Sequence, residues 1–197
     1  RLPVPDELAP YPVSSAIEID GRLWLSPSGR GVHLYDRRII RSFDAENSGL
    51  PSDIVYHMAV SGNGRVWCST WNGVGIYDGT GWATISRRHG LPDNLVTCVL
   101  FGPGGEQYFG THRGAGILRD GEWEVIDRDR GLSSNTVNHL MLDHGGRLWI
   151  STEGGGLSML NGDSLRTLGT EQGLPASQVQ ATVQAADSAV WAATRRG

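Results

Sequence analysis

The sequence has little of what marks several large classes of protein. Its 197 residues include two cysteines, Cys68 and Cys98, which are too few for a disulfide framework. No apolar run approaches the roughly 20 residues of a membrane-spanning helix, and the first residues lack the apolar stretch of a signal peptide. No basic run is present and the formal net charge is −4. We therefore expect no nucleic-acid partner and no membrane segment.

Three further signals are missing. The chain does not begin with methionine, so it is either a mature processed protein or a piece of a longer one, and we favour the piece. No segment shows a sustained helical period, so no real helix is expected. Neither G-x-G-x-x-G nor G-x-S-x-G occurs, and no spacing of carboxylates indicates sugar cleavage. We therefore assign no catalytic residue and no cofactor, and expect no enzyme activity from this chain.

What the chain does contain is a repeat of 41 or 42 residues, marked by Gly-Leu-Pro or Gly-Leu-Ser triplets. These triplets begin at Gly49, Gly90, Gly131 and Gly173. An aromatic residue follows each glycine 18 positions later, and these residues are Trp67, Tyr108, Trp149 and Trp191. Repeats of this length form stacked units that cannot bury their apolar faces alone.

One repeat, residues 131–161, shows what each unit contains. After the Gly-Leu-Ser turn come three segments of strand length, at 135–142, 147–152 and 157–160, separated by glycine-containing turns. A weaker fourth strand covers 164–168 and leads into the next repeat. Four short antiparallel strands of this kind make one blade of a β-propeller.

We therefore predict an all-β fold, a β-propeller built of four-stranded antiparallel blades, over a single region at 1–197. Residues 1–12 carry four prolines and are expected to form an N-terminal linker or edge. The repeats are placed at approximately 13–48, 49–89, 90–130, 131–172 and, incompletely, 173–197. About four and a half blades are present. We favour an excerpt of a larger propeller over the alternative, a closed ring of five blades.

The recurring aromatic residues are expected to pack between sheets rather than bind a ligand, because a blade lies against neighbours on both faces. Trp24 belongs to the same column. The histidines do not form a metal motif: His57 and His139 share a repeat position with Cys98 and Ala181, and a position that accepts cysteine and alanine is a packing position. The acidic loop at 127–131 lacks the remaining oxygen ligands of a calcium site. We therefore assign no metal site, and expect both thiols to be buried and free.

The combined pattern resembles a known family. Gly-Leu-Pro-Ser/Asp-Asn-x-Val, then Asp-x-x-Gly-Arg-Leu-Trp-Ile-Ser/Gly-Thr, then Gly-Leu-x-x-Tyr/Leu-Asp/Asn-Gly resembles the two-component regulator propeller repeat. The best copies are at 131–161 and 49–79, and the resemblance covers the chain from about residue 16 to 197. Departures are the loops at 102–105 and 186–189, and Tyr108 in place of tryptophan.

The resemblance implies a function as well as a fold. Members of this family typically form seven-bladed propellers outside the cytoplasmic membrane, as input regions of bacterial signalling proteins, and many sense carbohydrate fragments. It therefore implies a periplasmic or extracellular region that binds a small molecule or oligosaccharide, with further blades or a second copy as a protein partner. Two alternatives stay open: a propeller enzyme similar to the streptogramin lyases, and a protein-interaction scaffold.

The ligand-binding rim is predicted from the loops. Those that lead into the first strand of each repeat are alike, whereas those between the second and third strands differ. In a propeller both kinds lie on one rim, and variable side chains on a regular scaffold are typical of a binding surface. The candidate ligand-binding residues are Trp71, Asn72, His112, Arg113 and Glu153. Trp71 is expected to stack on a ring and the others to hydrogen-bond; the alternative is a set of ordinary solvated turns.

Overall fold

The chain is described here by a computed structural model covering residues 10–36 and 39–196. Almost all regular structure is antiparallel sheet. Blade 1 contains β1 (Val13–Ile19), β2 (Arg22–Pro27), β3 (Val32–Asp36) and β4 (Ile39–Phe43). Blade 2 contains β5 (Val55–Val60), β6 (Val66–Thr70), β7 (Gly73–Tyr77) and β8 (Trp82–Ile85). Blade 3 contains β9 (Val96–Phe101), β10 (Gln107–Thr111), β11 (Gly114–Arg119) and β12 (Glu122–Ile126).

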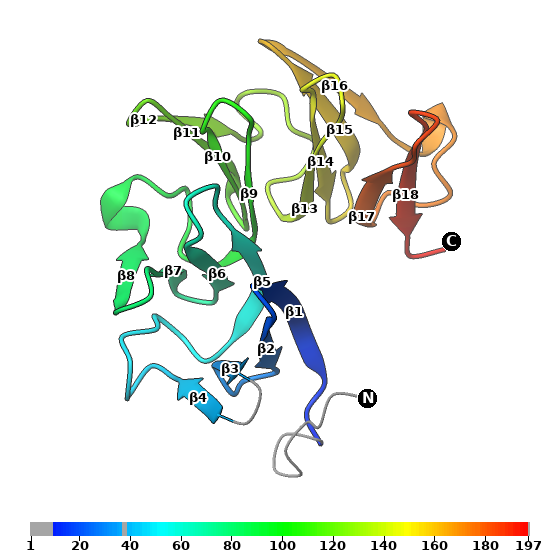
Figure 1. Cartoon of the computed structure of the whole chain (residues 1–197). Coiled ribbons are helices and arrows are strands. Elements are labelled where there is room, and N and C mark those ends of the chain that lie inside the picture. Colours follow the sequence, from blue (N-terminus) through cyan, green and yellow to red (C-terminus); the bar gives the residue numbers. More distant parts are fainter. Residues whose placement is uncertain (1–9, 37–38, 197) are drawn as a thin grey trace.

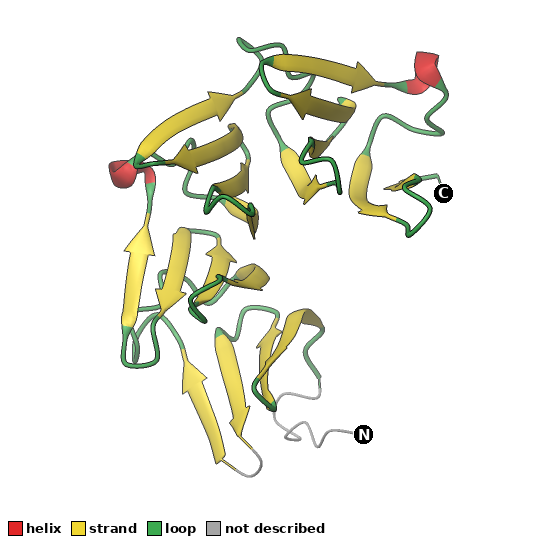
Figure 2. Cartoon of the chain, turned by 45° about the horizontal axis from the view of Figure 1, so that its top comes forward, coloured by secondary structure: helices red, strands yellow, loops and turns green. Residues whose placement is uncertain are grey.

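Blade 4 contains β13 (Val137–Leu142), β14 (Leu148–Thr152), β15 (Gly156–Asn161) and β16 (Ser164–Leu168). Blade 5 has two strands, β17 (Val179–Gln184) and β18 (Val190–Thr194). Two single 3-10 turns, at Arg87–His89 and Thr170–Gln172, are the helical segments among the described residues, and Figure 2 shows both after the outermost strand of a blade. The all-β propeller prediction is therefore confirmed.

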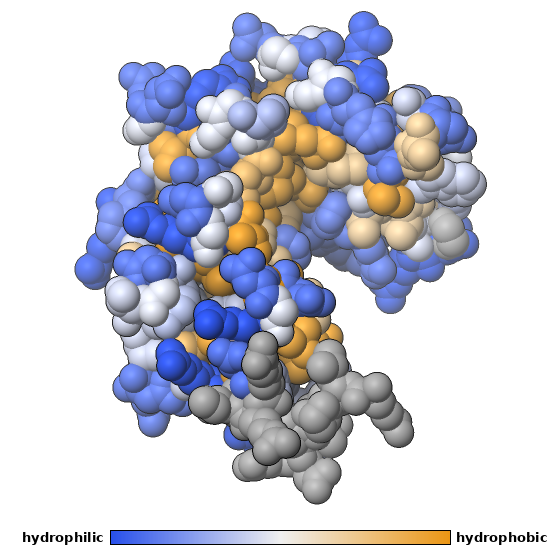
Figure 3. Space-filling view, in the orientation of Figure 1, coloured by the Kyte–Doolittle hydropathy of each residue, from blue (hydrophilic) through white to orange (hydrophobic). Residues whose placement is uncertain are grey.

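The blades form an open arc. Figure 1 shows β1, β5, β9, β13 and β17 on the inside and the fourth strands on the outside, with blade 1 and blade 5 at opposite ends. Apolar surface follows the inside of the arc, and hydrophilic residues cover its outside (Figure 3). A closed five-bladed ring is therefore not the arrangement of this chain. Most of the predicted N-terminal segment, residues 1–9, lies outside the described part of the chain.

The aromatic column fills the spaces between blades, as expected, at four of its five positions. The exposed fractions of these four side chains are Trp24 4%, Trp67 6%, Tyr108 7% and Trp149 9%. Trp149 packs with Leu157 of its own blade and Val179 of blade 5 in one apolar cluster. At the fifth position the prediction is wrong, because Trp191 is 67% exposed. The face of blade 5 that carries Trp191 is not covered within the described chain.

The hairpin between the first two strands of blade 4 is fastened by a buried carboxylate. Asp143 Oδ2 accepts a hydrogen bond from Trp149 Nε1 at 2.9 Å and one from Arg147 Nε at 2.6 Å. Burial alone would raise the pKa of this carboxyl, but the bonds from Trp149 and Arg147 outweigh burial and hold the pKa below its usual value. Blade 2 has Ser61 at the same position. No partner is recorded there for the buried indole nitrogen of Trp67.

Two substitutions in the aromatic column test whether the burial of an aromatic side chain determines its contribution to stability. Trp149→Ala should lower the free energy of unfolding by about 3–5 kcal/mol, as large-to-small changes in a packed core do. Trp191→Ala, at the equivalent but exposed position, should cost less than about 1 kcal/mol. Urea denaturation followed by circular dichroism measures both. If both substitutions lowered the free energy of unfolding equally, the position in the repeat, and not the burial of the side chain, would determine the loss of stability.

A second pair of substitutions tests the missing carboxylate of blade 2. Ser61→Asp should stabilise the chain by about 1 kcal/mol, because it gives the buried indole N–H of Trp67 the acceptor that Asp143 gives Trp149. Trp67→Phe removes the indole N–H, so Ser61→Asp made on that background should bring no gain. The four chains form a double-mutant cycle in urea denaturation. A gain that persists on the phenylalanine background would refute the proposed bond.

Candidate functional site

One rim of the arc gathers two kinds of loop. The lead-in loops join one blade to the inner strand of the next, and the variable loops join the second and third strands of a blade. In blades 2, 3 and 4 a threonine hydroxyl spans the variable loop. Thr70 Oγ1 donates to the carbonyl of Gly73 at 2.8 Å and accepts the N–H of Asn72 at 3.1 Å. Thr111 repeats both bonds with Gly114 and Arg113. The loops are therefore short and fixed, and the residues between threonine and glycine project from the rim.

A glycine closes each variable loop and ties it to the next blade. These residues, Gly31, Gly73, Gly114 and Gly156, all have positive φ. A Cβ at any of them would lie within 2.5 Å of the carbonyl oxygen that ends the fourth strand of its own blade, so only glycine fits. Their N–H groups donate to the lead-in loop of the following blade, with acceptors at 3.0, 2.6, 2.7 and 2.7 Å on Asp53, Asn94, Asn135 and Ser177. The two kinds of loop are thus held side by side.

An open hollow lies at this rim over blades 1–3. It has a volume of about 960 Å³ and is open to solvent. Trp71, 54% exposed, and Ile54, 42% exposed, give it an apolar wall. The N–H of Trp71 donates to the carbonyl of Ile54 at 3.0 Å, which fixes the two residues together. We call this hollow the Trp71 pocket; its other polar lining includes Ser52, Asp53, Asn72, Asp93, Asn94 and His112.

The structure brings together three of the five predicted residues and separates the other two. Trp71, Asn72 and His112 line the Trp71 pocket. Arg113 stands beside it, with Nε 3.5 Å from Oδ2 of the lining residue Asp93. Glu153 belongs to a different part of the rim. Three of the five candidates thus meet at one hollow over blades 1–3, while the ligand role of all five residues stays a prediction.

Glu153 is held in a hydrogen-bonded network between blades 4 and 5. Its Oε2 accepts from Gln178 Nε2 at 2.7 Å and from Asn138 Nδ2 at 3.3 Å. Asn138 also donates to the carbonyl of Val179 at 2.9 Å, and Arg195 Nη1 donates to Gln178 Oε1 at 3.3 Å. A smaller hollow of about 620 Å³ lies beside this network, lined by Gln178, Arg195 and neighbouring residues. Glu153 thus fastens one blade to the next.

The sequence analysis missed the contribution of the lead-in loops. The likeness of these loops between repeats favours a structural role. Asn94 is indeed structural: its Oδ1 accepts the N–H of Arg87 at 2.8 Å, and its Nδ2 donates to Asn72 at 3.3 Å. Asp53 and Asp93, however, also face the Trp71 pocket. The signal for Asp93 was available, because its repeat position is occupied by Ser52, Ser134 and Ala176 and so varies as a binding position does.

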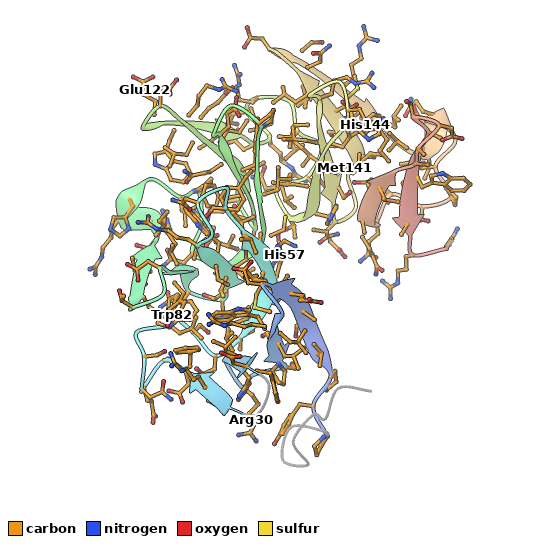
Figure 4. All side chains as sticks on the ribbon, viewed as in Figure 1. Arg30, His57, Trp82, Glu122, Met141 and His144 are labelled. Atoms are coloured by element: carbon orange, nitrogen blue, oxygen red, sulfur yellow. The ribbon has the colours of Figure 1, made fainter. Side chains whose placement is uncertain are left out.

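The column of His57 and His139 lies on the inner strands, at a β-bulge in each blade; Figure 4 shows His57 on β5, at the inside of the arc. Side chains of this column reach the next blade. Ser15 Oγ accepts the N–H of Met58 at 3.0 Å, and His139 Nδ1 accepts the N–H of Thr182 at 3.4 Å. Cys98 accepts a backbone bond from the next inner strand in the same way. The column therefore joins neighbouring blades.

The column's environment is apolar. Burial lowers the pKa of both histidines, and for His57 the neighbouring His139 lowers it further. Cys68 and Cys98 are buried and free, as expected, and burial raises the pKa of Cys98 to about 11. Within the described residues, no group of three or more His, Cys, Asp or Glu side chains is arranged to hold a metal ion.

The lowered histidine pKa values predict how stability depends on pH. Each histidine has a folded-state pKa below its unfolded value of about 6.5, so the unfolded chain binds more protons in the window between the two values. The contribution to stability is therefore complete above about pH 6.5 and is lost as the pH falls through the folded pKa. Urea midpoints measured from pH 5 to pH 7.5 should rise and then level off. Replacing His57 and His139 by serine, the residue at position 15, should flatten this slope; an unchanged slope would assign it to other groups.

The comparisons with known proteins agree with this geometry. Residues 131–154 match the family model described as two component regulator propeller. A comparison with the curated proteins found no match. Among the described residues, no helix has the length and apolar character needed to span a membrane.

Solved structures share the fold over most of this chain. The extracellular domain of a putative hybrid two component system from B. thetaiotaomicron aligns with a TM-score of 0.83 and 20% identity, covering 95% of this chain and 27% of that one. A similar domain, of a putative one component system from the same organism, aligns with a TM-score of 0.79 and 20% identity, covering 94% of this chain and 26% of that one. Virginiamycin B lyase from Staphylococcus aureus aligns with a TM-score of 0.70 and 17% identity, covering 94% of this chain and 64% of that one. This chain therefore spans about a quarter of the length of the first two structures.

Proposed function

We propose that this arc of blades, which contains a two component regulator propeller repeat, is part of the extracellular or periplasmic sensing region of a bacterial signalling protein. The matched repeat and the likeness to two extracellular domains of such systems support this role. Its ligand is a small saccharide or similar ring compound that binds in the Trp71 pocket. The observation that carries the proposal is the half-exposed indole of Trp71 in a hollow of the rim of about 960 Å³.

The chemistry of the pocket favours a ring compound with polar edges. A pyranose ring has an apolar face that stacks on an indole and a rim of hydroxyls that needs hydrogen-bond partners. Trp71 and Ile54 supply the apolar surface. Carboxylates, amides and the imidazole of His112 stand around it. The lead-in and variable loops that carry these groups are fixed to each other, so little ordering is needed on binding.

The enzyme alternative requires an acid/base pair beside the pocket. His112 and two carboxylates do line it. Within the described residues, no hydrogen bond or ion pair joins His112 to a carboxylate, and the recorded partner of the Asp93 carboxylate among the side chains is Arg113. This arrangement supports binding as the main role of the pocket. A scaffold would present a broad, flat apolar face, whereas this rim is hollowed and mixed in polarity.

We also propose that a further blade or a second copy covers the exposed face of blade 5. Trp191 and Val183 are 67% and 61% exposed there. The preceding blade buries the equivalent Trp149 against the strands that follow it. The same apolar arrangement is thus presented at blade 5, which supports a partner with the chemistry of another blade.

Binding to the rim is tested with a glycan array that presents neutral, cationic and anionic oligosaccharides. The chain should bind at least one of them, and Trp71→Ala should weaken the tightest interaction about tenfold or more, because the stacking surface is lost. Arg113→Ala should weaken it several-fold. Trp191→Ala removes another exposed indole, at 67% against 54% for Trp71, away from the rim and is the matched control. If Trp71→Ala and Arg113→Ala bind like the unchanged chain, the ligand does not use this rim.

A further inference from the structure

Some polar groups of the Trp71 pocket form hydrogen bonds within the protein, whereas others keep capacity for further hydrogen bonds. The second kind determines which ligand groups the pocket can bind. The two amides are engaged with the protein: Asn94 donates to Asn72 at 3.3 Å, and Asn72 Nδ2 lies 3.5 Å from the carbonyl of Pro51. Asn94 Oδ1 accepts the N–H of Arg87. These side chains hold the loops together. They leave two carboxylates, the hydroxyl of Ser52 and the imidazole of His112 as the lining groups with capacity to bind a ligand.

Both carboxylates keep acceptor capacity toward the pocket. Asp53 Oδ1 accepts the N–H of Ala45 at 2.8 Å, and no partner is recorded for Oδ2 within the described chain. Asp93 Oδ1 accepts the N–H of Leu95 at 3.2 Å, and Oδ2 is 3.5 Å from Arg113 Nε. A carboxylate accepts about four hydrogen bonds. The two carboxylates therefore favour a ligand that donates hydrogen bonds.

Positive charge is scarce at the same place. The sequence contains no lysine, so arginines supply its fixed side-chain cations. None of the residues that line the pocket is an arginine. The nearby Arg113 is paired with Asp93, and the guanidinium of Arg30 lies over the ring of Tyr11 at 4.3 Å. Two carboxylates thus line the pocket. The guanidinium beside it belongs to Arg113, which is paired with Asp93 and whose side chain is 64% exposed.

We infer that the Trp71 pocket selects saccharides without negative charge, whose hydroxyl or amino groups donate to Asp53 and Asp93. This inference rests on the proposed function and specifies its ligand class. A uronate or sulfate group would lie near two like charges, and like charges at contact distance repel each other even at a site that is open to solvent. A neutral ring gains the same stacking on Trp71 and satisfies the carboxylates. Asp53 and Asp93 are therefore specificity-determining residues.

The chain itself supplies conservative replacements for both residues. Asn94 and Asn135 stand at the repeat position of Asp53 and make the same loop bond, to Arg87 and Arg128. Ser52 and Ser134 stand at the position of Asp93. Asp53→Asn and Asp93→Ser therefore remove charge with residues that this loop already accommodates. Asp120→Asn removes one charge at an exposed hairpin outside the pocket lining and is the matched control; its φ of 52° suits asparagine.

The experiment uses the glycan array, followed by titration calorimetry with the tightest-binding oligosaccharide and its C6-oxidised, uronic-acid counterpart. The unchanged chain should bind neutral or amino oligosaccharides and should bind the oxidised counterpart at least tenfold more weakly. Asp53→Asn and Asp93→Ser should each reduce this discrimination several-fold, and Asp93→Ser most, because it also frees Arg113. Asp120→Asn should leave the discrimination unchanged.

The outcomes separate this inference from the proposed function. Equal or tighter binding of anionic oligosaccharides, abolished by Trp71→Ala, would overturn the charge selection and leave the proposed function standing. Binding of no oligosaccharide on the array would contradict the proposed function and the inference with it. Discrimination that persists in both aspartate variants would show that other groups cause it. The variants are made separately and their urea midpoints measured, so a folding defect in one leaves the other as the test.

Discussion

The arrangement of this chain depends on one backbone hydrogen bond that recurs at every joint. A glycine at the end of each variable loop donates its N–H to a carbonyl in the lead-in loop of the next blade, at 2.6–3.0 Å. The glycine is obligatory because its φ is positive and any Cβ would meet a strand carbonyl of its own blade. The bond sets how closely successive blades approach, and the aromatic residues then fill the space between them. It also holds each variable loop next to a lead-in loop, and the Trp71 pocket lies where these two kinds of loop meet.

The repeat made most of the fold predictable from the sequence. Turns, strands and the aromatic column recur together, so each copy supports the interpretation of the others. Trp191 shows the limit of this reasoning. It stands at the same repeat position as Trp149, but burial is a property of a joint between two blades, and the described chain has no blade on that side of Trp191. The pattern therefore predicts what a residue packs against only where its neighbour is present.

The candidate site was predictable in its location and less so in its members. Variable loops pointed to the rim, and Trp71, Asn72 and His112 do meet there. Glu153 differs because Gln178 and Asn138 lie within hydrogen-bonding reach of its carboxylate. At the positions equivalent to Asn138 and Gln178, Trp71 has Tyr56 and Leu95 as neighbours in the repeat, and its indole stays exposed. Which loops remain free for a ligand thus depends on cross-blade partners, and a single repeat considered alone does not reveal them.

The open arc has a consequence for how the chain unfolds. Each blade packs against its immediate neighbours, so local opening does not require the whole chain to unfold at once. Blade 5 has two strands and one packed face, with Val179 as its fully buried apolar residue. In the isolated chain we expect its backbone amides to exchange fastest among the described sheets, and a partner on its exposed face would protect them. The Trp71 pocket lies two joints away, so its loops keep their geometry while the far end of the arc frays.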